Sequence, residues 1–330
     1  MKKNHRYAPY LRLLAFIAGA ALLTACGSKT TTGTAAGSDT KTAQEGGSDQ
    51  DKLQVMASFY PMYDFALKIG GEYVEVTDMV PAGTEPHDWE PAPKDLAKLE
   101  EADVFVYSGA GMEYWAEDIL TSIQNTKLVT VEASNGITLL DVEDGETAEQ
   151  SHEHTHGDTD PHVWLDPIKA KQEMANIRDA FSEADPAHAE DYAANYEEAA
   201  AKLDTLDAHF RETLAGCTKH EIVVSHEAFG YLCSAYGITQ MGIEGLMPDS
   251  EPDPARMAEI TDFVRAHDVK VIFSEELVSE KVAQTIAKET GAEVETLNPL
   301  EGLSEEDQAA GADYFSVMED NLAKLAAALS

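Results

Sequence analysis

Residues 221–243 read EIVVSHEAFGYLCSAYGITQMGI and contain, in order, a strand-like run, a short helical segment and a second strand-like run. The run EIVV is dominated by aliphatic, β-branched residues, which is typical of strands that are buried on both faces of a sheet. Strands that alternate with helices favour a parallel sheet with helices on its faces. The stretch therefore predicts a strand–helix–strand unit, and His226 falls where its first strand ends.

The same alternation continues in both directions from this stretch. The predicted strands cover residues 53–60, 72–80, 103–111, 127–133, 221–227, 238–243, 269–276 and 292–299. The predicted intervening helices cover residues 61–71, 92–102, 112–124, 228–237, 254–268 and 279–291. This order favours the α/β class, with two Rossmann-like lobes built on mostly parallel sheets.

A long helix is predicted between the two lobes. Apolar residues keep helical spacing from about Ala187 to Ala215, and the stretch contains no proline. At ~1.5 Å per residue this helix would be roughly 40 Å long, enough to run along both lobes as a rigid connector. We therefore expect limited opening rather than a wide hinge motion. A closing helix is predicted from about Asp313 to Leu329.

The N-terminus has the pattern of a bacterial export signal. The first 25 residues carry four basic and no acidic residues, and their apolar run LLAFIAGAALL is too short for a mature membrane span. Residues 23–26, LTAC, resemble a lipobox, which would make Cys26 the lipidated first residue of the mature chain; a plain secreted protein is the alternative. Residues 26–52 are rich in Gly, Ser and Thr and predict a flexible tether.

The predicted domains follow from these observations. They are a signal peptide (1–25), a tether (26–52), an N-terminal α/β lobe (53–167) that includes a His-rich loop (144–160), linker helices (168–215) and a C-terminal α/β lobe (216–330).

The charge of the chain is strongly negative. Without the basic residues of the predicted signal, 19 basic residues remain against 61 acidic ones, a formal charge of −42. Such a surface repels the phosphates of nucleic acid and attracts cations, so we expect no nucleic-acid partner. Beyond Cys26 only Cys217 and Cys233 remain; outside the cytoplasm they could be bridged or free, and a Cys-based zinc site is not expected.

Three histidines occur where apolar, strand-like runs end: His87, His162 and His226. In sheets of alternating strands and helices, ligands bind beyond the carboxyl ends of the strands, and neutral imidazole is a common ligand for zinc and related ions. The three are 75 and 64 residues apart, so only the fold can bring them together. Nearby prolines stiffen the loops of the first two, and nearby carboxylates could orient the imidazoles.

Four motifs carry a resemblance to a known family. They are PHDWEP (86–91), DPHVWLDP (160–167), VVSHEAFGYL (223–232) and LNPLEGL (297–303). Together with the lipobox and an acidic, His-rich loop, they make the chain similar to the zinc-specific solute-binding lipoproteins of bacterial metal ABC importers. The resemblance implies two α/β lobes joined by a long helix, with one metal ion in the interlobe cleft. It also implies an ABC permease and its ATPase as partners.

The resemblance also implies the metal ligands, which are His87, His162, His226 and Glu301. Asn298 occupies the place of an aspartate ligand of manganese-binding relatives. If Glu301 is displaced, Glu275, Glu276 or a water would complete the shell. Three nitrogens and one carboxylate oxygen suit tetrahedral Zn²⁺, whereas Mn²⁺ prefers more oxygen ligands; a manganese-binding member of the same family is the alternative.

A second metal-binding signal is the stretch SHEHTHGDTD (151–160), which contains His152, His154 and His156. Short acidic, His-rich tracts are metal-binding by composition. The resemblance implies an accessory loop beside the cleft that collects or senses zinc; a loop without a role is the alternative. The letters HEHTH also match the zinc-protease motif HExxH, but that motif requires a helix, and neither Gly157 nor the surrounding acids favour one.

These observations predict a binding protein rather than an enzyme. It would capture extracytoplasmic Zn²⁺ as a lipid-anchored monomer and deliver it to a membrane permease. A zinc-dependent hydrolase is the rival, and it would need an open coordination position and a general base, for which Glu227 is the candidate. An adhesin is a third alternative, and no feature of the sequence specifically favours it.

Overall fold

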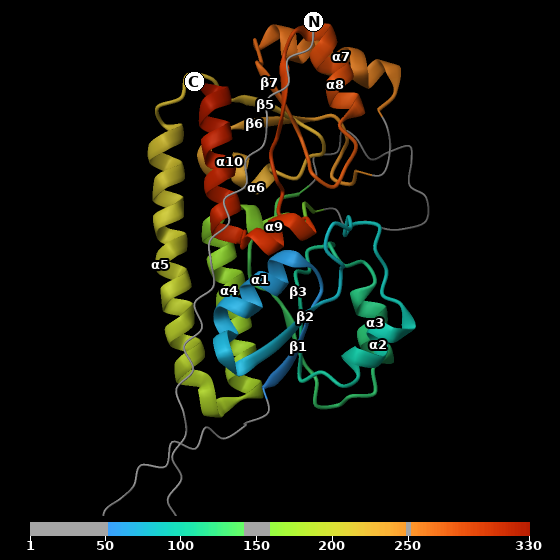
Figure 1. Cartoon of the computed structure of the whole chain (residues 1–330), viewed down its shortest axis with the longest axis vertical. Coiled ribbons are helices and arrows are strands. Elements are labelled where there is room, and N and C mark those ends of the chain that lie inside the picture. Colours follow the sequence, from blue (N-terminus) through green and yellow to red (C-terminus); the bar gives the residue numbers. More distant parts are fainter. Residues whose placement is uncertain (1–51, 142–158, 249–251) are drawn as a thin grey trace, which may run out of the picture. The chain divides into compact units, whose positions relative to one another are not determined.

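The computed structural model describes residues 52–141, 159–248 and 252–330, and these residues form two four-stranded sheets (Figure 1). The first contains β1 (Leu53–Ala57), β2 (Val74–Asp78), β3 (Val104–Tyr107) and β4 (Val129–Glu132) in the order β2-β1-β3-β4. The second contains β5 (Glu221–Val224), β6 (Thr239–Gly242), β7 (Val271–Ser274) and β8 (Glu293–Thr296) in the order β6-β5-β7-β8. All of these strands pair in parallel, so the predicted α/β fold with two lobes is confirmed.

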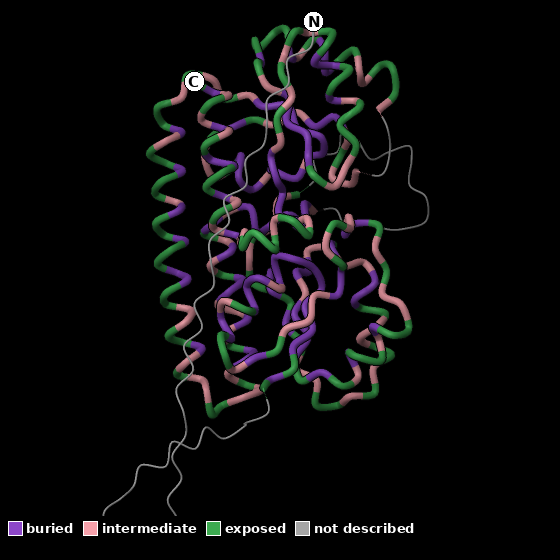
Figure 2. Tube along the Cα trace, in the orientation of Figure 1, coloured by how far each residue is buried: buried purple, intermediate pink, exposed green. Residues whose placement is uncertain are grey.

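The central strands are apolar because helices cover both of their faces. Val104 and Val106 of β3 pack into one hydrophobic cluster, whereas Phe105 between them packs into another with Trp115. The covering helices are α1 (Tyr60–Gly70), α2 (Pro93–Leu99) and α3 (Ala116–Ser122) in the first lobe, and α6 (Gly230–Tyr236), α7 (Pro254–Ala266) and α8 (Lys281–Thr290) in the second. In Figure 2 the strands are mostly buried, whereas the helices alternate between buried and exposed positions.

Two long helices follow the first sheet. Helix α4 (Pro167–Ala184) leads through a 3₁₀ turn (Pro186–His188) into α5 (Ala189–Leu214), which has 26 residues and is therefore ~39 Å long. Helix α5 contacts α1 of the first lobe and α6 and α10 (Tyr314–Leu329) of the second, so the predicted helix along both lobes is confirmed (Figure 1). It begins two residues later than predicted because Pro186 starts the 3₁₀ turn.

One hydrophobic cluster joins the two lobes. It contains Phe59 of the first lobe, Phe229 and Tyr314 of the second, and Trp164 between them.

Short helix α9 (Glu305–Ala310), which the sequence pattern did not predict, is capped by Ser304 and ends at Gly311, whose φ is +83°. The limited opening expected of the long helix remains a prediction.

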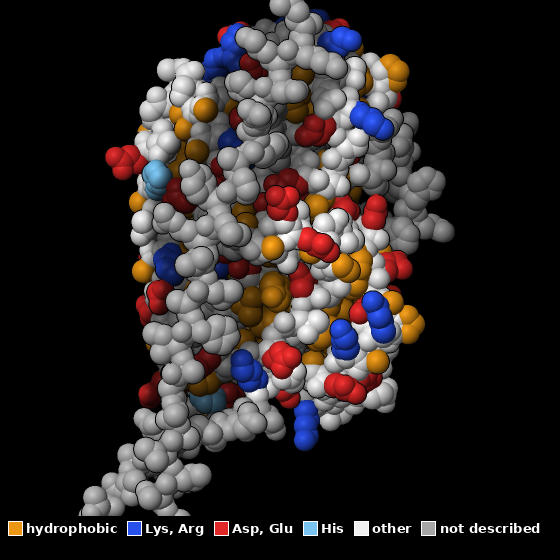
Figure 3. Space-filling view, in the orientation of Figure 1, with side chains coloured by type: hydrophobic (Ala, Val, Ile, Leu, Met, Phe, Trp, Pro, Cys, Tyr) orange, Lys and Arg blue, Asp and Glu red, His pale blue; other side chains and the backbone are white. Residues whose placement is uncertain are grey.

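The predictions for the N-terminal segment fall mostly outside the described residues. The predicted signal peptide, Cys26 and nearly all of the tether belong to the undescribed part, and the predicted domain boundaries remain predictions. Among the residues that the structure describes, none of the helices has the length and apolar character of a membrane span. Acidic side chains are spread over the face shown in Figure 3, with Lys and Arg among them.

The two cysteines of the second lobe are free thiols, so the disulfide alternative is not realised in the structure. Cys233 is buried, and this burial raises the pKa of its thiol. The sulfur of Cys217 instead faces the carbonyl oxygens of Thr213 and Ala326, at 3.8 and 4.0 Å.

Candidate metal centre

The four side chains that the family resemblance implies as metal ligands converge on one buried point. His87 lies in the loop after β2, His162 directly precedes a 3₁₀ turn (Val163–Leu165), His226 follows β5, and Glu301 lies in the loop after β8. Their exposed fractions are 2%, 0%, 0% and 3%. The group therefore draws ligands from both lobes, at the edges where their parallel strands end.

The distances between the ligand atoms fit a four-coordinate metal. Glu301 Oε1 lies 3.2 Å from Nε2 of His87 and 3.0 Å from Nε2 of both His162 and His226. Nε2 of His162 lies 3.3 Å from Nε2 of each other histidine. The edge of a regular tetrahedron is about 1.6 times its centre-to-corner distance, so zinc–ligand distances of roughly 2.0–2.1 Å give edges of about 3.3–3.4 Å. The observed spacing is therefore close to that of a tetrahedral zinc shell.

Two buried carboxylates orient two of the imidazoles. Asp160 Oδ1 lies 2.8 Å from Nδ1 of His162 and also accepts its backbone N–H, at 2.9 Å. Glu275 Oε1 does the same for His226, at 2.8 and 3.1 Å. A carboxylate on Nδ1 keeps the proton there and directs the lone pair of Nε2 toward a metal.

His87 is held differently. Its backbone N–H donates to Glu85 Oε1 at 3.0 Å, but its buried Nδ1 has no hydrogen-bond partner among the described residues. Asp88, which follows it, donates its own backbone N–H to Glu85 rather than facing the imidazole. The three histidines are therefore not equivalent, and His87 is the one without a carboxylate that fixes its tautomer.

The electrostatics of the group follow from its burial. Burial alone would lower the pKa of His226, but the carboxylates of Glu275 and Glu301 outweigh it and raise this pKa well above its usual range. The pKa of His162 is raised in the same way, by Asp160 and Glu301. Burial alone would raise the pKa of Glu301, but the imidazoles, led by His226 and His87, hold it well below its usual range. Protons thus compete with a metal for these nitrogens.

The fallback ligands lie outside the group. Glu275 lies behind His226 on its Nδ1 side, and Glu276 is exposed, with its side chain hydrogen-bonded to those of Asn298 and Asp307. Sequence reasoning did not foresee that Glu275 would orient His226. A signal was present, because Glu275 follows β7, the strand that pairs with β5, and so ends at the same edge of the sheet.

Three further residues of the sequence motifs have structural roles. Asp166 Oδ1 accepts the backbone N–H of Ile168 at 2.8 Å and caps α4. Trp164 is fully buried and donates its indole N–H to the carbonyl oxygen of Pro299 at 2.8 Å. The carboxylate of Glu227, the candidate general base of a hydrolase, lies 3.5 Å from the Arg256 guanidinium on α7.

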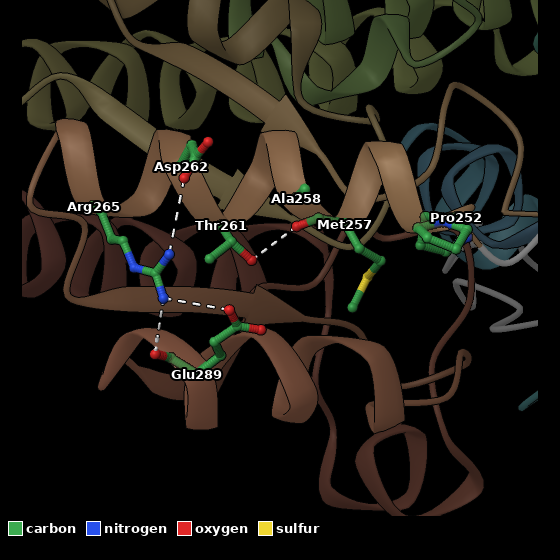
Figure 4. Close-up of a pocket in the computed structure, with 8 residues that line it drawn as sticks. Pro252, Met257, Ala258, Thr261, Asp262, Arg265 and Glu289 are labelled. Carbon is green, nitrogen blue, oxygen red and sulfur yellow. Dashed lines mark hydrogen bonds and ion pairs between the residues drawn. The ribbon is translucent and has the colours of Figure 1, made fainter.

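A groove on the second lobe is separate from this group. It is lined by α7 and α8, and Figure 4 shows Arg265 paired with Asp262 and Glu289 across it. Thr261 donates to the carbonyl oxygen of Met257. The polar side chains of the groove that Figure 4 labels are thus paired with one another or with the backbone, and none of the four converging residues lines it.

The accessory loop cannot be placed. His152, His154 and His156 lie outside the described residues. The residues on either side of it are described: Asp141 and Thr159 form an isolated antiparallel bridge, and Asp160 follows directly. The prediction that the loop collects zinc remains untested.

Two α/β lobes that jointly supply a buried group of three histidines and one glutamate have the architecture of a two-lobed metal-binding protein. Residues 55–328 match the family described as "Zinc-uptake complex component A periplasmic", and the chain belongs to this family. Because that family is one component of an uptake complex, the prediction of a binding protein rather than an enzyme is confirmed.

Named relatives agree with this assignment. The chain is 42% identical over 318 residues to the high-affinity zinc uptake system protein ZnuA of Bacillus subtilis, covering 94% of each chain. It is 40% identical over 278 residues to the zinc-binding lipoprotein AdcA of Streptococcus pneumoniae, covering 83% of this chain but only 55% of that protein. The crystal structure of the Zn(II)-bound ZnuA-like domain of AdcA is similar with a TM-score of 0.73 and 38% identity, over 84% of this chain and 99% of that one.

Proposed function

We propose that His87, His162, His226 and Glu301 bind one Zn²⁺ ion as a closed, four-ligand site. The observation that carries this proposal is the tetrahedron of ligand atoms, five of whose edges measure 3.0–3.3 Å, with each of the four residues 3% exposed or less. Four protein ligands complete the shell that zinc prefers in non-catalytic sites.

Zinc suits the site better than manganese does. Three of the four donor atoms are imidazole nitrogens, and Mn²⁺ prefers oxygen ligands and a higher coordination number. Glu275 and Glu276, which could have supplied further oxygens, are engaged elsewhere. The zinc-binding relatives support the same choice.

The role we propose is capture of Zn²⁺ outside the cytoplasm and its delivery to an ABC permease and its ATPase. Membership of a zinc-uptake family supports it. We propose that a lipid on Cys26 holds the protein, as a monomer, at the outer surface of the membrane, close to this complex. Since both lobes supply ligands, any docking event that separates the lobes would break the shell and free the ion.

A binding role fits the surroundings of the metal better than hydrolysis does. A catalytic zinc site keeps one coordination position open for water, whereas here a carboxylate takes the fourth place. Glu227 is drawn toward Arg256 on α7, where it does not serve as a base for a metal-bound water. Chelator-sensitive hydrolysis of peptide or ester panels would revive the enzyme hypothesis.

We propose an accessory role for His152, His154 and His156 as a low-affinity collector of zinc. Their composition supports it. Deleting residues 148–158 should remove a second, weaker zinc-binding event and leave the tight one. If the deletion leaves both events unchanged in titration, the collector hypothesis is wrong.

The ligand assignment is tested by single substitutions. His87→Ala, His162→Ala and His226→Ala should each weaken zinc binding sharply in a chelator-competition titration. His209→Ala is a matched control, because its imidazole is half-exposed on α5 and pairs with Glu319, at 2.8 Å, away from the four converging residues. Equal effects of the control and the three variants would refute the assignment. Titration of the wild-type chain with Zn²⁺ and Mn²⁺ in competition tests the choice of metal.

A further inference from the structure

Glu301 is presented by a turn with an unusual backbone. Leu300, the residue before it, has a φ of +63°, the left-handed region that residues with a Cβ rarely occupy. The side chain of Leu300 is nevertheless fully buried in the core. Such a conformation persists only where the surroundings hold it in place, and it occurs characteristically at functional sites.

The turn is held by two buried asparagines. The backbone N–H of Leu300 donates to Asn298 Oδ1 at 2.7 Å, which closes a local turn around Pro299. Asn321 of α10 then binds both backbone groups of Asn298: its Oδ1 accepts the N–H at 3.0 Å, and its Nδ2 donates to the carbonyl oxygen at 2.7 Å. The exposed fractions of Asn298 and Asn321 are 6% and 1%.

The same turn is tied to two of the other three ligand-bearing loops, those of His162 and His87. Trp164, two residues after His162, donates to the carbonyl oxygen of Pro299 at 2.8 Å. Gly83, four residues before His87, donates its backbone N–H to the carbonyl oxygen of Leu303 at 3.1 Å. The first lobe thus holds the middle and the end of the turn, whereas the asparagine pair of the second lobe holds its beginning.

Asn298 therefore has a role other than ligation. Its Oδ1 is engaged by the N–H of Leu300, and its backbone is engaged by Asn321. An asparagine suits this position because its short side chain can hydrogen-bond to its own backbone two residues on, which stabilises a turn that ordinary side chains disfavour.

We propose that Asn298 and Asn321 are positioning residues, which hold the turn so that the Glu301 carboxylate stays in the ligand tetrahedron, and that they thereby set the affinity for zinc. This inference rests on the proposed function. Without the pair, Leu300 is free to return to negative φ, and the peptide that carries Glu301 rotates away from the three imidazoles. Zinc then loses its only anionic ligand, although no residue that touches it has been changed.

A double-mutant cycle tests this proposal on the full chain. Zinc dissociation constants are measured by chelator competition for the wild type, Asn321→Ala, Glu301→Gln and the double variant. We expect Asn321→Ala alone to weaken zinc binding about tenfold to a hundredfold, the usual effect of losing an outer partner of a metal ligand. In the Glu301→Gln background the same change should have less than a twofold effect, because the ligand it positions is already lost.

Three safeguards separate positioning from general stability. Met318→Ala removes another fully buried side chain of α10 and should lower the melting temperature while leaving zinc affinity within twofold. Asn298→Ala removes the side-chain bonds of Asn298 to the N–H of Leu300 and to Glu276, leaves its backbone bonds to Asn321 in place, and serves if Asn321→Ala fails to fold. The visible spectrum of bound Co²⁺ reports the coordination shell directly, and both asparagine variants should change it as Glu301→Gln does.

Each outcome decides between the hypotheses. The positioning role would be overturned, while the metal site stands, if the losses of zinc affinity from Asn321→Ala and Glu301→Gln simply add. An Asn321→Ala variant with wild-type zinc affinity and Co²⁺ spectrum would overturn it as well. A Glu301→Gln variant with wild-type zinc affinity would instead contradict the proposed function itself.

Discussion

Removing the carboxylate behind His226 should weaken zinc binding even though that carboxylate never touches the metal. Glu275 is 4% exposed, and its Oε1 accepts both Nδ1–H and the backbone N–H of His226, at 2.8 and 3.1 Å. Glu275→Ala leaves both donors buried without an acceptor. The backbone donor loses its acceptor equally with and without metal, whereas the bond from Nδ1–H is stronger when Nε2 holds a metal, so mainly this bond contributes to the change in affinity.

The size of the effect follows from this one bond. A hydrogen bond to a charged group contributes about 1.5–3 kcal/mol, which corresponds to roughly tenfold to a hundredfold in affinity. Loss of Glu275 also removes the largest of the interactions that raise the pKa of His226, so protons compete less with zinc in the variant. At low pH the lost hydrogen bond weakens zinc binding, whereas the reduced competition from protons strengthens it. The loss should therefore be larger at about pH 8.5 than at about pH 6.

The assay is chelator competition with zinc at both pH values, on wild type, Glu275→Ala and Glu275→Gln. Glutamine keeps an acceptor oxygen but not the charge, so its loss should lie between those of the other two. Glu289→Ala is the control, since that carboxylate is exposed and pairs with Arg265 away from the site. The Co²⁺ spectrum of Glu275→Gln should stay tetrahedral. A Glu275→Ala variant that folds and binds zinc within twofold of wild type would refute the reasoning.

Three further predictions follow from the same structure. Because the pKa of His226 is raised well above its usual range, zinc should displace protons at pH 7, and zinc affinity should fall as pH falls. Calorimetry in buffers of different ionisation enthalpy should detect this proton release. A binding heat that is independent of the buffer contradicts it. In the metal-free protein the same shift means that the pairing of His226 with its carboxylates contributes stability that is fully present below about pH 6.5 and is lost as pH rises through the folded-state pKa. Glu173 of α4 is fully buried, and neither of its carboxylate oxygens has a hydrogen-bond partner among the described residues; this burial raises its pKa well above the usual range. Its ionisation therefore opposes folding above about pH 4.3. Glu173→Gln should raise the unfolding free energy at pH 7 by about 1–3 kcal/mol, with a gain that disappears in mild acid. Zinc at about a thousand times its dissociation constant should stabilise the fold by about 4 kcal/mol, and chelator should reverse the rise in melting temperature; an unchanged melting temperature argues against a site formed only in the folded state.

The fold was predictable because its signals are local. Aliphatic runs such as EIVV, separated by helices of ordinary length, determine parallel strands wherever they occur, and Asp166 before Pro167 is a recognisable helix start. His226 could be selected for the same reason, since it lies where the run EIVV ends, whereas His87 and His162 stood out by the motifs PHDWEP and DPHVWLDP that contain them. What brings the three histidines together is the strand order, which is the same in both sheets and follows only from the complete topology.

The fourth ligand could not be derived from local pattern. Glu275 and Glu301 both follow strands of the second sheet, and only the resemblance of the LNPLEGL motif favoured Glu301. What distinguishes Glu301 is the turn before it, in which Leu300 is left-handed and Asn298 is bound by Asn321, 23 residues further along the chain. A contact between a turn and a helix that far along the chain leaves no mark in the spacing of either segment.

Buried polar residues were missed for a related reason. Glu173 lies on the same helical face as Ala170 and Ile177, three and four residues away, so the periodicity of α4 predicts burial there but the residue type predicts exposure. Glu275 was considered as a fallback metal ligand, whereas in the structure its carboxylate orients the imidazole of His226. In both cases the environment of the side chain depends on its neighbours from other elements.

The most direct test of the metal site is a crystal structure of the zinc-loaded protein with anomalous diffraction measured at the zinc absorption edge. The assignment predicts one strong peak inside the ligand tetrahedron, about 2.0–2.2 Å from Nε2 of His87, His162 and His226 and from a carboxylate oxygen of Glu301. A peak that lies elsewhere, or a zinc ion that lacks any one of these three imidazoles, would contradict it.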